Sequence, residues 1–237
     1  MFKQFTYSAE PSIIGVDNGF SQLEFKECWL KKHEAYKEIE RMVIVNHVDD
    51  FLKNQHDIKL SDIDPLKGVL YKDAKTTDFM VFSPFFFGCK YVVSQKVVDC
   101  FRSVGVSKIE YNLIPVDIKN TSKKYYLLFV PVIANKEIIF SKSYIYHKDD
   151  TLLDQKNYLP IKSYGDYQEV MKKDPFHSFA RICLPNRYES RDIISVQGAV
   201  DLFFSERLIE CLQGIGATNF EIPERQVELV FSELVEV

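Results

Sequence analysis

Closely spaced cysteines are missing from this sequence. The five cysteines are far apart and odd in number, and no two of them form a C-x-x-C pair. This spacing argues against a structural zinc site, which usually draws its ligands from neighbouring cysteines or histidines. We therefore expect reduced thiols in a cytoplasmic protein. The cysteines are Cys28, Cys89, Cys100, Cys183 and Cys211.

A long apolar run is also missing. The most apolar segment, FMVFSPFFFGCKYVV from Phe79, is interrupted by Ser, Pro, Gly and Lys, whereas a membrane-spanning helix needs about 20 consecutive apolar residues. The first residues, MFKQFTYSAE, lack the apolar stretch that follows the charged start of a secretory signal. We therefore expect a cytoplasmic location and no membrane partner.

An excess of positive charge is absent too. The formal net charge is −4 at pH 7, which argues against a nucleic-acid partner, because nucleic-acid-binding proteins usually carry a strongly basic face. Adjacent lysines occur in widely separated pairs, and this separation predicts solvated surface. The pairs are Lys31/Lys32, Lys123/Lys124 and Lys172/Lys173.

Motifs that bind nucleotides or support hydrolysis are not found. No P-loop or G-x-S-x-G sequence occurs, and Gly214-Ile-Gly216 fails as a dinucleotide fingerprint because Asn219 stands where its third glycine belongs. The densest set of possible metal ligands lies between His47 and Asp57, without an H-E-x-x-H spacing. The sequence thus predicts no catalytic residue, no cofactor and no metal, in a protein that is not an enzyme.

A twenty-residue pattern occurs twice, as VVSQKVVDCFRSVGVSKIEY over residues 92–111 and FFSERLIECLQGIGATNFEI over residues 203–222. The serines of the two segments are 205 − 94 = 111 residues apart. This similarity predicts two pseudo-repeated units, each of strand, helix and strand. At the same offset, Ser94 aligns with Ser205, Cys100 with Cys211, Gly105 with Gly216 and Glu110 with Glu221.

Each unit has the signals of a capped helix. Ser94 and Ser205 are good N-cap residues, because a serine hydroxyl can accept a hydrogen bond from a free amide of the first turn. Apolar residues then recur with the spacing of an amphipathic helix. Gly105 and Gly216 stand where a left-handed residue would end it. We interpret the two serines as caps and not as nucleophiles.

The rest of the chain is rich in strand-like segments. There are 19 Phe and 13 Tyr residues, and aromatic side chains suit the half-buried surface of a sheet. Strands are predicted at NLIPVDI, YYLLFVPVIA, EIIFSKSYIY, FARICLP, RDIISV and VELVFSELVEV, and a polar excursion over residues 148–176. The prediction is an α+β fold with mixed, mainly antiparallel sheets and a few amphipathic helices. The chain is predicted to form one domain, 1–237, with lobes near 1–88 and 89–237.

The C-terminal segment is acidic. From Glu221 onward five glutamates accompany only Arg225, a balance of −5 + 1 = −4 that equals the net charge of the whole chain. The segment is either a solvated strand face or a docking surface for a basic partner, since complementary charge speeds encounter and sets specificity. The candidate interface residues are Glu221, Glu224, Glu228 and Glu233, and Glu236 is the fifth glutamate.

Five short segments in a fixed order carry a resemblance to a known family. They are TTDFMVF from Thr76, YVVSQKVVDCFRSVG, YYLLFVPV, IIFSKSYIY and LFFSERLIECLQGIGATNFE. Their order resembles an immunity-protein family of bacterial polymorphic toxin systems, first catalogued as a domain of unknown function and later as the eleventh immunity family. The similarity covers about residues 75–225, and the ending Gly-Ala-Thr-Asn-Phe departs from an expected Thr-Gly pair. The motif residues are Thr77, Asp78, Phe79, Ser94, Lys96, Ile139, Phe140, Lys142, Ser143, Ser205, Arg207, Leu208, Gly216 and Thr218.

The resemblance implies a cytoplasmic protein that binds a cognate toxin domain stoichiometrically, and so covers its active site or locks an inactive form. It does not name the chemistry of the toxin. Two other hypotheses remain open. One is a hydrolase-like enzyme whose site is dispersed in the sequence and uses His47 or His177. The other is an oligomeric scaffold in which the repeated unit is an assembly edge.

Overall fold

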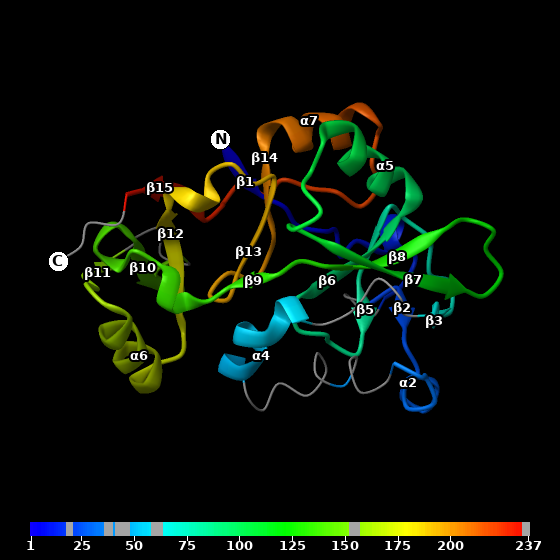
Figure 1. The fold of residues 1–237 in the computed structure, drawn as a ribbon, viewed down its shortest axis with the longest axis horizontal. Coiled ribbons are helices and arrows are strands. Elements are labelled where there is room, and N and C mark those ends of the chain that lie inside the picture. Colours follow the sequence, from blue (N-terminus) through cyan, green and yellow to red (C-terminus); the bar gives the residue numbers. More distant parts are fainter. Residues whose placement is uncertain (18–20, 36–39, 41–47, 58–63, 152–156, 234–237) are drawn as a thin grey trace.

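Three mixed, mainly antiparallel sheets and several short helices make up the α+β fold, which confirms the predicted fold class. The computed structural model describes residues 1–17, 21–35, 40, 48–57, 64–151 and 157–233 (Figure 1). Within these ranges no helix is both long and apolar enough to cross a lipid bilayer.

The largest sheet has seven strands in the order β4-β6-β8-β7-β3-β2-β5. Its middle strands are apolar at consecutive positions, as in residues 91–93 and 127–129, because both of their faces are covered by core. The sheet takes strands from both sides of residue 88. Its strands are β2 (Leu23–Glu24), β3 (Leu66–Leu70), β4 (Phe79–Met80), β5 (Phe82–Ser83), β6 (Cys89–Ser94), β7 (Asn112–Ile118) and β8 (Tyr125–Phe129).

The other two sheets have four strands each. One has the order β1-β14-β13-β9 and the other β11-β10-β12-β15, with β15 parallel to β12. The strands of the first are β1 (Phe2–Gln4), β9 (Val132–Ile133), β13 (Ile193–Val196) and β14 (Phe203–Ser205). Those of the second are β10 (Tyr144–His147), β11 (Tyr158–Leu159), β12 (His177–Pro185) and β15 (Glu228–Ser232).

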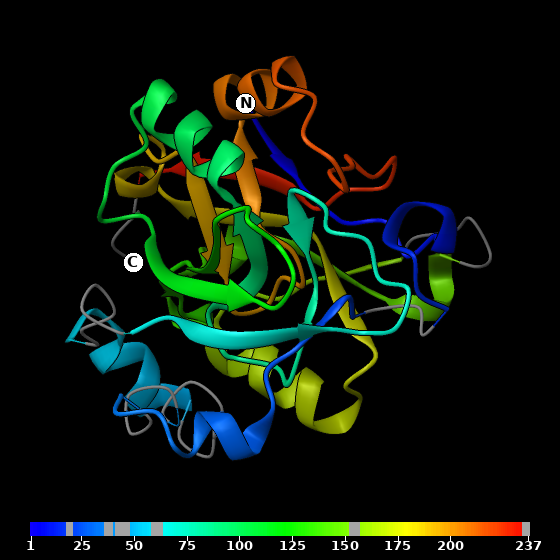
Figure 2. The ribbon, with the colours of Figure 1, turned by 90° about the vertical axis from the view of Figure 1, so that its right-hand side faces the viewer.

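The helices cover the sheets from several sides. Helices α5 and α7 lie together on one side of the large sheet, and α2 and α4 lie on the opposite side (Figures 1 and 2). The α-helices are α1 (Pro11–Ile14), α2 (Glu27–Leu30), α4 (Val48–Asn54), α5 (Gln95–Val104), α6 (Tyr164–Lys173) and α7 (Glu206–Gly214). The 3-10 helices are η1 (Gln55–Asp57), η2 (Asn135–Glu137), η3 (Phe140–Lys142), η4 (Lys148–Thr151) and η5 (Asn186–Tyr188).

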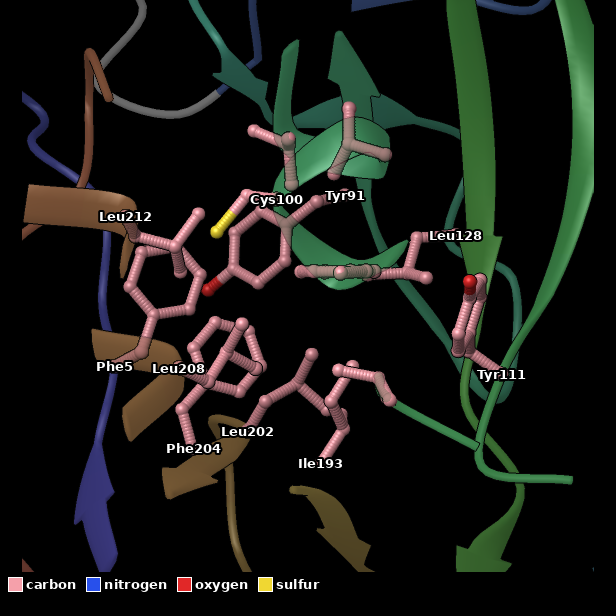
Figure 3. Close-up of a cluster of buried hydrophobic side chains, with 14 of the residues drawn as sticks. Phe5, Tyr91, Cys100, Tyr111, Leu128, Ile193, Leu202, Phe204, Leu208 and Leu212 are labelled. Carbon is pink, nitrogen blue, oxygen red and sulfur yellow. The ribbon is translucent and has the colours of Figure 1, made fainter. Parts of the chain in front are cut away.

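Phe5 lies at the centre of the core beneath α5 and α7 (Figure 3). Its ring is fully buried and has centroid distances of 4.7 Å to Phe79, 4.8 Å to Tyr91 and 5.3 Å to Phe204. Such aromatic pairs add roughly 0.5–1.5 kcal/mol each beyond the area they bury. Phe5, which directly follows β1, thus joins β4, β6 and β14 through one cluster of rings.

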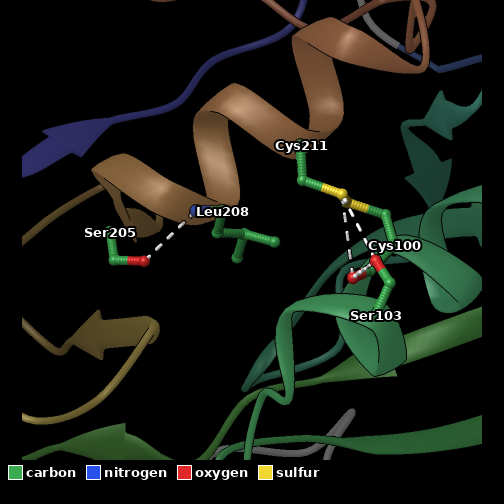
Figure 4. The surroundings of a disulfide bond; sticks show 5 residues. All are labelled: Cys100, Ser103, Ser205, Leu208 and Cys211. Carbon is green, nitrogen blue, oxygen red and sulfur yellow. Dashed lines mark hydrogen bonds between the residues drawn. A yellow bond between two sulfur atoms is a disulfide. The ribbon is translucent and has the colours of Figure 1, made fainter.

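A disulfide joins the two helices. Cys100 of α5 and Cys211 of α7 are bonded, with their Cα atoms 6.2 Å apart (Figure 4). The prediction of reduced thiols is therefore wrong for this pair, because a separation of 111 residues hides their proximity. The remaining cysteines, Cys28, Cys89 and Cys183, are free.

Ser94 and Ser205 both occupy N-cap positions, but their hydroxyl groups have different roles. Each hydroxyl donates to an aspartate, Ser94 to Asp78 at 2.6 Å and Ser205 to Asp192 at 2.5 Å. Only Ser205 also accepts a bond from its helix, from the Leu208 amide at 3.4 Å. The predicted side-chain cap is confirmed at Ser205 and wrong at Ser94, whose hydroxyl makes no such bond.

The loop after each of these helices is hydrogen-bonded to the aspartate that binds the N-cap serine of the other helix. Asp78 accepts hydrogen bonds of 2.9 Å from the amide and the hydroxyl of Thr218, which follows α7. Glu110, which follows α5, accepts bonds of 2.7 and 2.9 Å from the amides of Asp192 and Ile193. The two units are therefore reciprocally anchored, and their origin as repeats stays a prediction.

Three of the predicted elements differ from the structure. The EIIFSKSYIY segment contains η3 in its middle and forms a strand only from Tyr144, where β10 begins. The second unit ends in an isolated bridge of Glu221 with Thr6 in place of a strand. The polar excursion contains α6, which begins with a capping box of Ser163 and Asp166. The S-x-x-D spacing of that box was a usable helix signal.

Candidate interaction surface

One row of exposed and half-exposed side chains crosses all four strands of the sheet β11-β10-β12-β15. Strand pairing places Tyr144 of β10 opposite Arg181 of β12, and Arg181 opposite Glu228 of β15. Tyr158 of β11 adds the fourth member, because its ring lies 5.4 Å from the ring of Tyr144. The two tyrosines are 41% and 52% exposed. We call these four residues the cross-sheet row.

A bulge in β12 turns Arg181 toward solvent. Ile145 pairs with Phe179 and the preceding Tyr144 pairs with Arg181, so Ala180 is the extra residue. Phe179 and Ile182 on either side of this irregularity are both buried in the core. A strand without the bulge would place residues 179 and 181 on one face, because side chains alternate.

The inner face of this sheet is firmly packed. The ring of Tyr167, from α6, lies 5.3 Å from Phe140 and 5.4 Å from Phe179. The amide of Cys183 in β12 donates to the Ser143 hydroxyl at 2.9 Å. The row therefore stands on strands that are held from behind by a helix and a core.

Two interactions fix the position of Arg181. Its Nε donates to Glu228 Oε2 at 2.6 Å, and its guanidinium carbon lies 4.9 Å from the ring centroid of Tyr144. The hydrogen bond to Glu228 raises the pKa of Arg181 above its ordinary value. The guanidinium is thus charged and held in place between a carboxylate and an aromatic ring.

The four predicted glutamates do not have equivalent surroundings. Glu228 is bound to Arg181, so it is not a free carboxylate. Glu221 lies beside Thr6, Glu224 lies in the loop before β15, and Glu233 follows β15, all three with exposed side chains. Only Glu228 therefore belongs to the row. Glu236 lies outside the described residues.

The histidines of the enzyme hypothesis are only partly described. His47 lies outside the described residues. His177 and His147 are cross-strand neighbours on β12 and β10, and His147 Nε2 lies 3.0 Å from Asp174 Oδ2. The side chain of His177, 8% exposed, has its Nδ1 2.9 Å from the Asp174 carbonyl oxygen. His177 thus has a polar partner, and its use in catalysis stays a prediction.

No set of three or more His, Cys, Asp or Glu side chains in the described ranges is arranged to hold a metal ion. Of the possible ligands between His47 and Asp57, the structure describes those from Asp49 onward, which lie in α4 and η1.

Several motif residues of the resemblance have structural roles here. Lys96 donates to the Gly216 carbonyl at 2.9 Å and lies 3.5 Å from Asp78 Oδ2. Lys142 donates to the Ser232 hydroxyl, and Ser143 donates to the Ile139 carbonyl. These bonds hold loops and strands together at two places in the fold.

Sequence reasoning found one member of the row and missed three. Tyr144, Tyr158 and Arg181 lie in segments that were described only as strand or polar excursion. The available signal was Arg181 in the middle of the apolar segment FARICLP. A charged residue there indicates an outward-facing position, but its neighbours across the sheet depend on pairing between distant segments.

Comparison of the sequence with models of protein families and with curated proteins found no match. Membership of the immunity family therefore stays a prediction based on the short motifs.

Proposed function

We propose that this protein binds a bacterial toxin domain stoichiometrically and neutralises it in the cytoplasm of the producing cell. The cross-sheet row is the observation that supports this proposal. Tyr and Arg are the residue types most often responsible for binding energy at protein interfaces. The row presents two exposed tyrosines and one arginine on a single sheet face.

The row is also pre-organised. Arg181 is already held by Glu228 and by the ring of Tyr144, and Tyr144 packs beside Tyr158. A partner that binds here orders fewer free side chains, which lowers the entropic cost of association. The row thus supports a firm contact with a protein surface without any reactive group.

Charge around β15 indicates the chemistry of that partner. Glu224 lies in the loop before β15 and Glu233 directly follows β15, both with exposed side chains, and a toxin domain with a basic patch matches them. In this proposal the toxin domain binds to this face through the surface that holds its active site. Covering that active site is enough to neutralise the toxin.

The proposal is tested by isolating the partner. A tagged form of the protein is expected to co-purify in equal amounts with the product of an adjacent toxin gene. Co-expression is expected to restore growth of cells that express this toxin. If the toxin neither binds nor is neutralised, the proposed function is wrong.

Replacing Arg181 is expected to weaken toxin binding strongly. Arg181→Ala removes a hot-spot side chain and leaves Glu228 without its cation, so Kd should rise roughly 30-fold or more. Titration calorimetry measures the change. Arg191→Ala is the matched control, because Arg191 lies over Tyr188 at 4.8 Å in a similar stack outside the row. An equal loss in both variants would contradict the role of the row.

Reversing the charge of Glu224 is expected to slow association with a basic toxin several-fold at low salt, with less effect at high salt, because steering by exposed charges is screened. Stopped-flow measurements at several salt concentrations test Glu224→Lys against Glu210→Lys, which changes an exposed glutamate on α7 by the same charge. Glu228→Lys is unsuitable, since it would also disrupt Arg181. An unchanged on-rate in Glu224→Lys would leave the acidic segment as solvated surface.

A further inference from the structure

A second surface lies at the other end of the molecule, where α2 and the β7–β8 hairpin border a groove. The groove has a volume of about 650 Å³. Its lining residues come from α2, β3, β7 and β8. In Figure 1 the elements α2, β3 and β7 lie at the opposite end of the long axis from β10, β11 and β15. It shares no residue with the cross-sheet row. Any ligand that it takes is therefore separate from the proposed toxin contact.

The charge of the groove is opposite to that of the whole chain. Four exposed lysines line it against one carboxylate, that of Asp117, although the chain has a net charge of −4. Lys67 lies opposite Asp117 in the register of β3 and β7. Among the described residues none of the four lysines forms a salt bridge with an acidic side chain. The lysines are Lys67 on β3 and Lys119, Lys123 and Lys124 at the turn of the β7–β8 hairpin.

The single tryptophan of the chain forms one wall of this groove. Trp29 is 39% exposed, and Lys26 Nζ lies 5.4 Å from its ring centroid. Trp29 and Lys67 also line a smaller hollow of about 190 Å³. They therefore form a ridge between two hollows. A large exposed ring on such a ridge offers a flat apolar contact beside the ammonium groups.

The floor of the groove is rigid and apolar. Val116 and Ile118 of β7 are 5% and 6% exposed, and Tyr125 of β8 is also buried. Strands β7 and β8 pair along their length, and Val116 lies opposite Tyr125 at the end of the hairpin that borders the groove. Charge on the rim, an exposed ring on one wall and an apolar floor together suit a ligand that is both acidic and partly apolar.

We propose that this groove binds an extended acidic polypeptide segment that carries an apolar side chain. The carboxylates of the segment meet the lysines of the hairpin turn and of β3, and the apolar side chain packs on Trp29. Nucleic acid fits less well. Single strands are usually held by several stacking aromatics, whereas Tyr125 is buried and the Tyr126 hydroxyl is bonded to Gln95 at 2.6 Å.

Trp29 provides a direct test, because the intrinsic tryptophan fluorescence of the protein comes from this one position. The full chain is titrated with a blocked peptide in which a pair of leucines is flanked on both sides by glutamates, with the same peptide carrying glutamine for glutamate, and with a thymidine oligonucleotide of matched length. The acidic peptide is expected to give a saturable change that weakens with salt, and the glutamine peptide none. No saturable change with the acidic peptide, or tighter binding of the oligonucleotide, would overturn the proposal.

Lysine pairs supply the matched variants. Lys123→Glu/Lys124→Glu is expected to weaken binding of the acidic peptide about ten-fold or more. Lys172→Glu/Lys173→Glu makes the same charge change at exposed positions of α6 and should leave the affinity within about two-fold. Equal losses in both would show a non-specific charge effect and refute the proposal.

A chemical experiment on the unaltered protein covers the case in which the groove variant does not fold. Lysine acetylation is followed by mass spectrometry with and without the acidic peptide. Protection is expected at Lys67, Lys119, Lys123 and Lys124, and not at Lys172 or Lys173. Uniform labelling would refute the groove as the site. Neither readout involves the toxin, so this proposal and the proposed function can fail separately.

Discussion

Reduction of the Cys100–Cys211 disulfide is expected to lower the free energy of unfolding by about 5 kcal/mol. The bond closes a loop of 111 residues, and in the chain-entropy description a closed loop of that length restricts the unfolded chain by about this amount. For a chain of this size the melting temperature should fall by roughly 10–20 °C. Urea unfolding of the oxidised and the reduced protein measures the difference.

Two variants separate the disulfide from other effects of the reductant. In Cys100→Ala/Cys211→Ala, reduction should change nothing, because the bond is already absent. Cys28→Ser removes an exposed free thiol and should retain the full response. Equal stability of the oxidised and reduced wild-type protein would contradict the prediction. A reducing cytoplasm normally keeps such pairs as thiols, so the cytoplasmic protein of our proposal would work with the lower stability.

The helices and strands could be predicted from the sequence more fully than the contacts between them. The two helices with serine starts and the strands β7, β8, β12 and β13 follow from local signals, namely capping residues, helical spacing and short apolar runs. The joining of α5 to α7 by the disulfide does not follow from any local signal. It depends on contacts between segments 111 residues apart.

The candidate surfaces illustrate the same limit. Glu228 was identified from the charge of its segment, but its bond to Arg181 depends on the parallel register of β12 and β15. The lysine pair Lys123/Lys124 was expected to be ordinary solvated surface. The structure gathers it with Lys67 and Trp29 because β3 pairs with β7. Sequence spacing alone could not bring these positions together.

A half-buried carboxylate beside β14 has the second largest expected effect on stability. Asp201 precedes β14 and is surrounded by Lys90 and Tyr91 of β6, with Tyr7 close by. Burial raises the pKa of Asp201 to about 6, although Lys90 and the hydroxyl of Tyr91 act in the opposite direction. Burial in turn lowers the pKa of Lys90.

The sign of the pH effect follows from proton binding. Between about pH 4 and pH 6 the folded protein holds a proton on Asp201 that the unfolded chain has already released. The stabilisation is complete below the unfolded pKa and is lost as the pH rises through the folded pKa. A difference of about two pKa units corresponds to about 3 kcal/mol. Asp201 should therefore make the fold less stable at pH 7 than at pH 4.

A comparison of variants isolates this contribution from the other carboxylates, some of which have the opposite sign. Burial alone would raise the pKa of Asp78, but hydrogen bonds from Ser94 and Thr218 outweigh it and hold that pKa below its usual value. Ionised Asp78 therefore stabilises the folded protein more as the pH rises. The difference in unfolding free energy between wild type and Asp201→Asn should change by about 2.5 kcal/mol from pH 4 to pH 7, because at pH 4 the unfolded chain already keeps part of its protons. Asp99→Asn makes the same change at an exposed aspartate on α5 and serves as the matched control. A wild-type curve parallel to that of Asp201→Asn would show that Asp201 titrates normally and is well solvated in the folded protein.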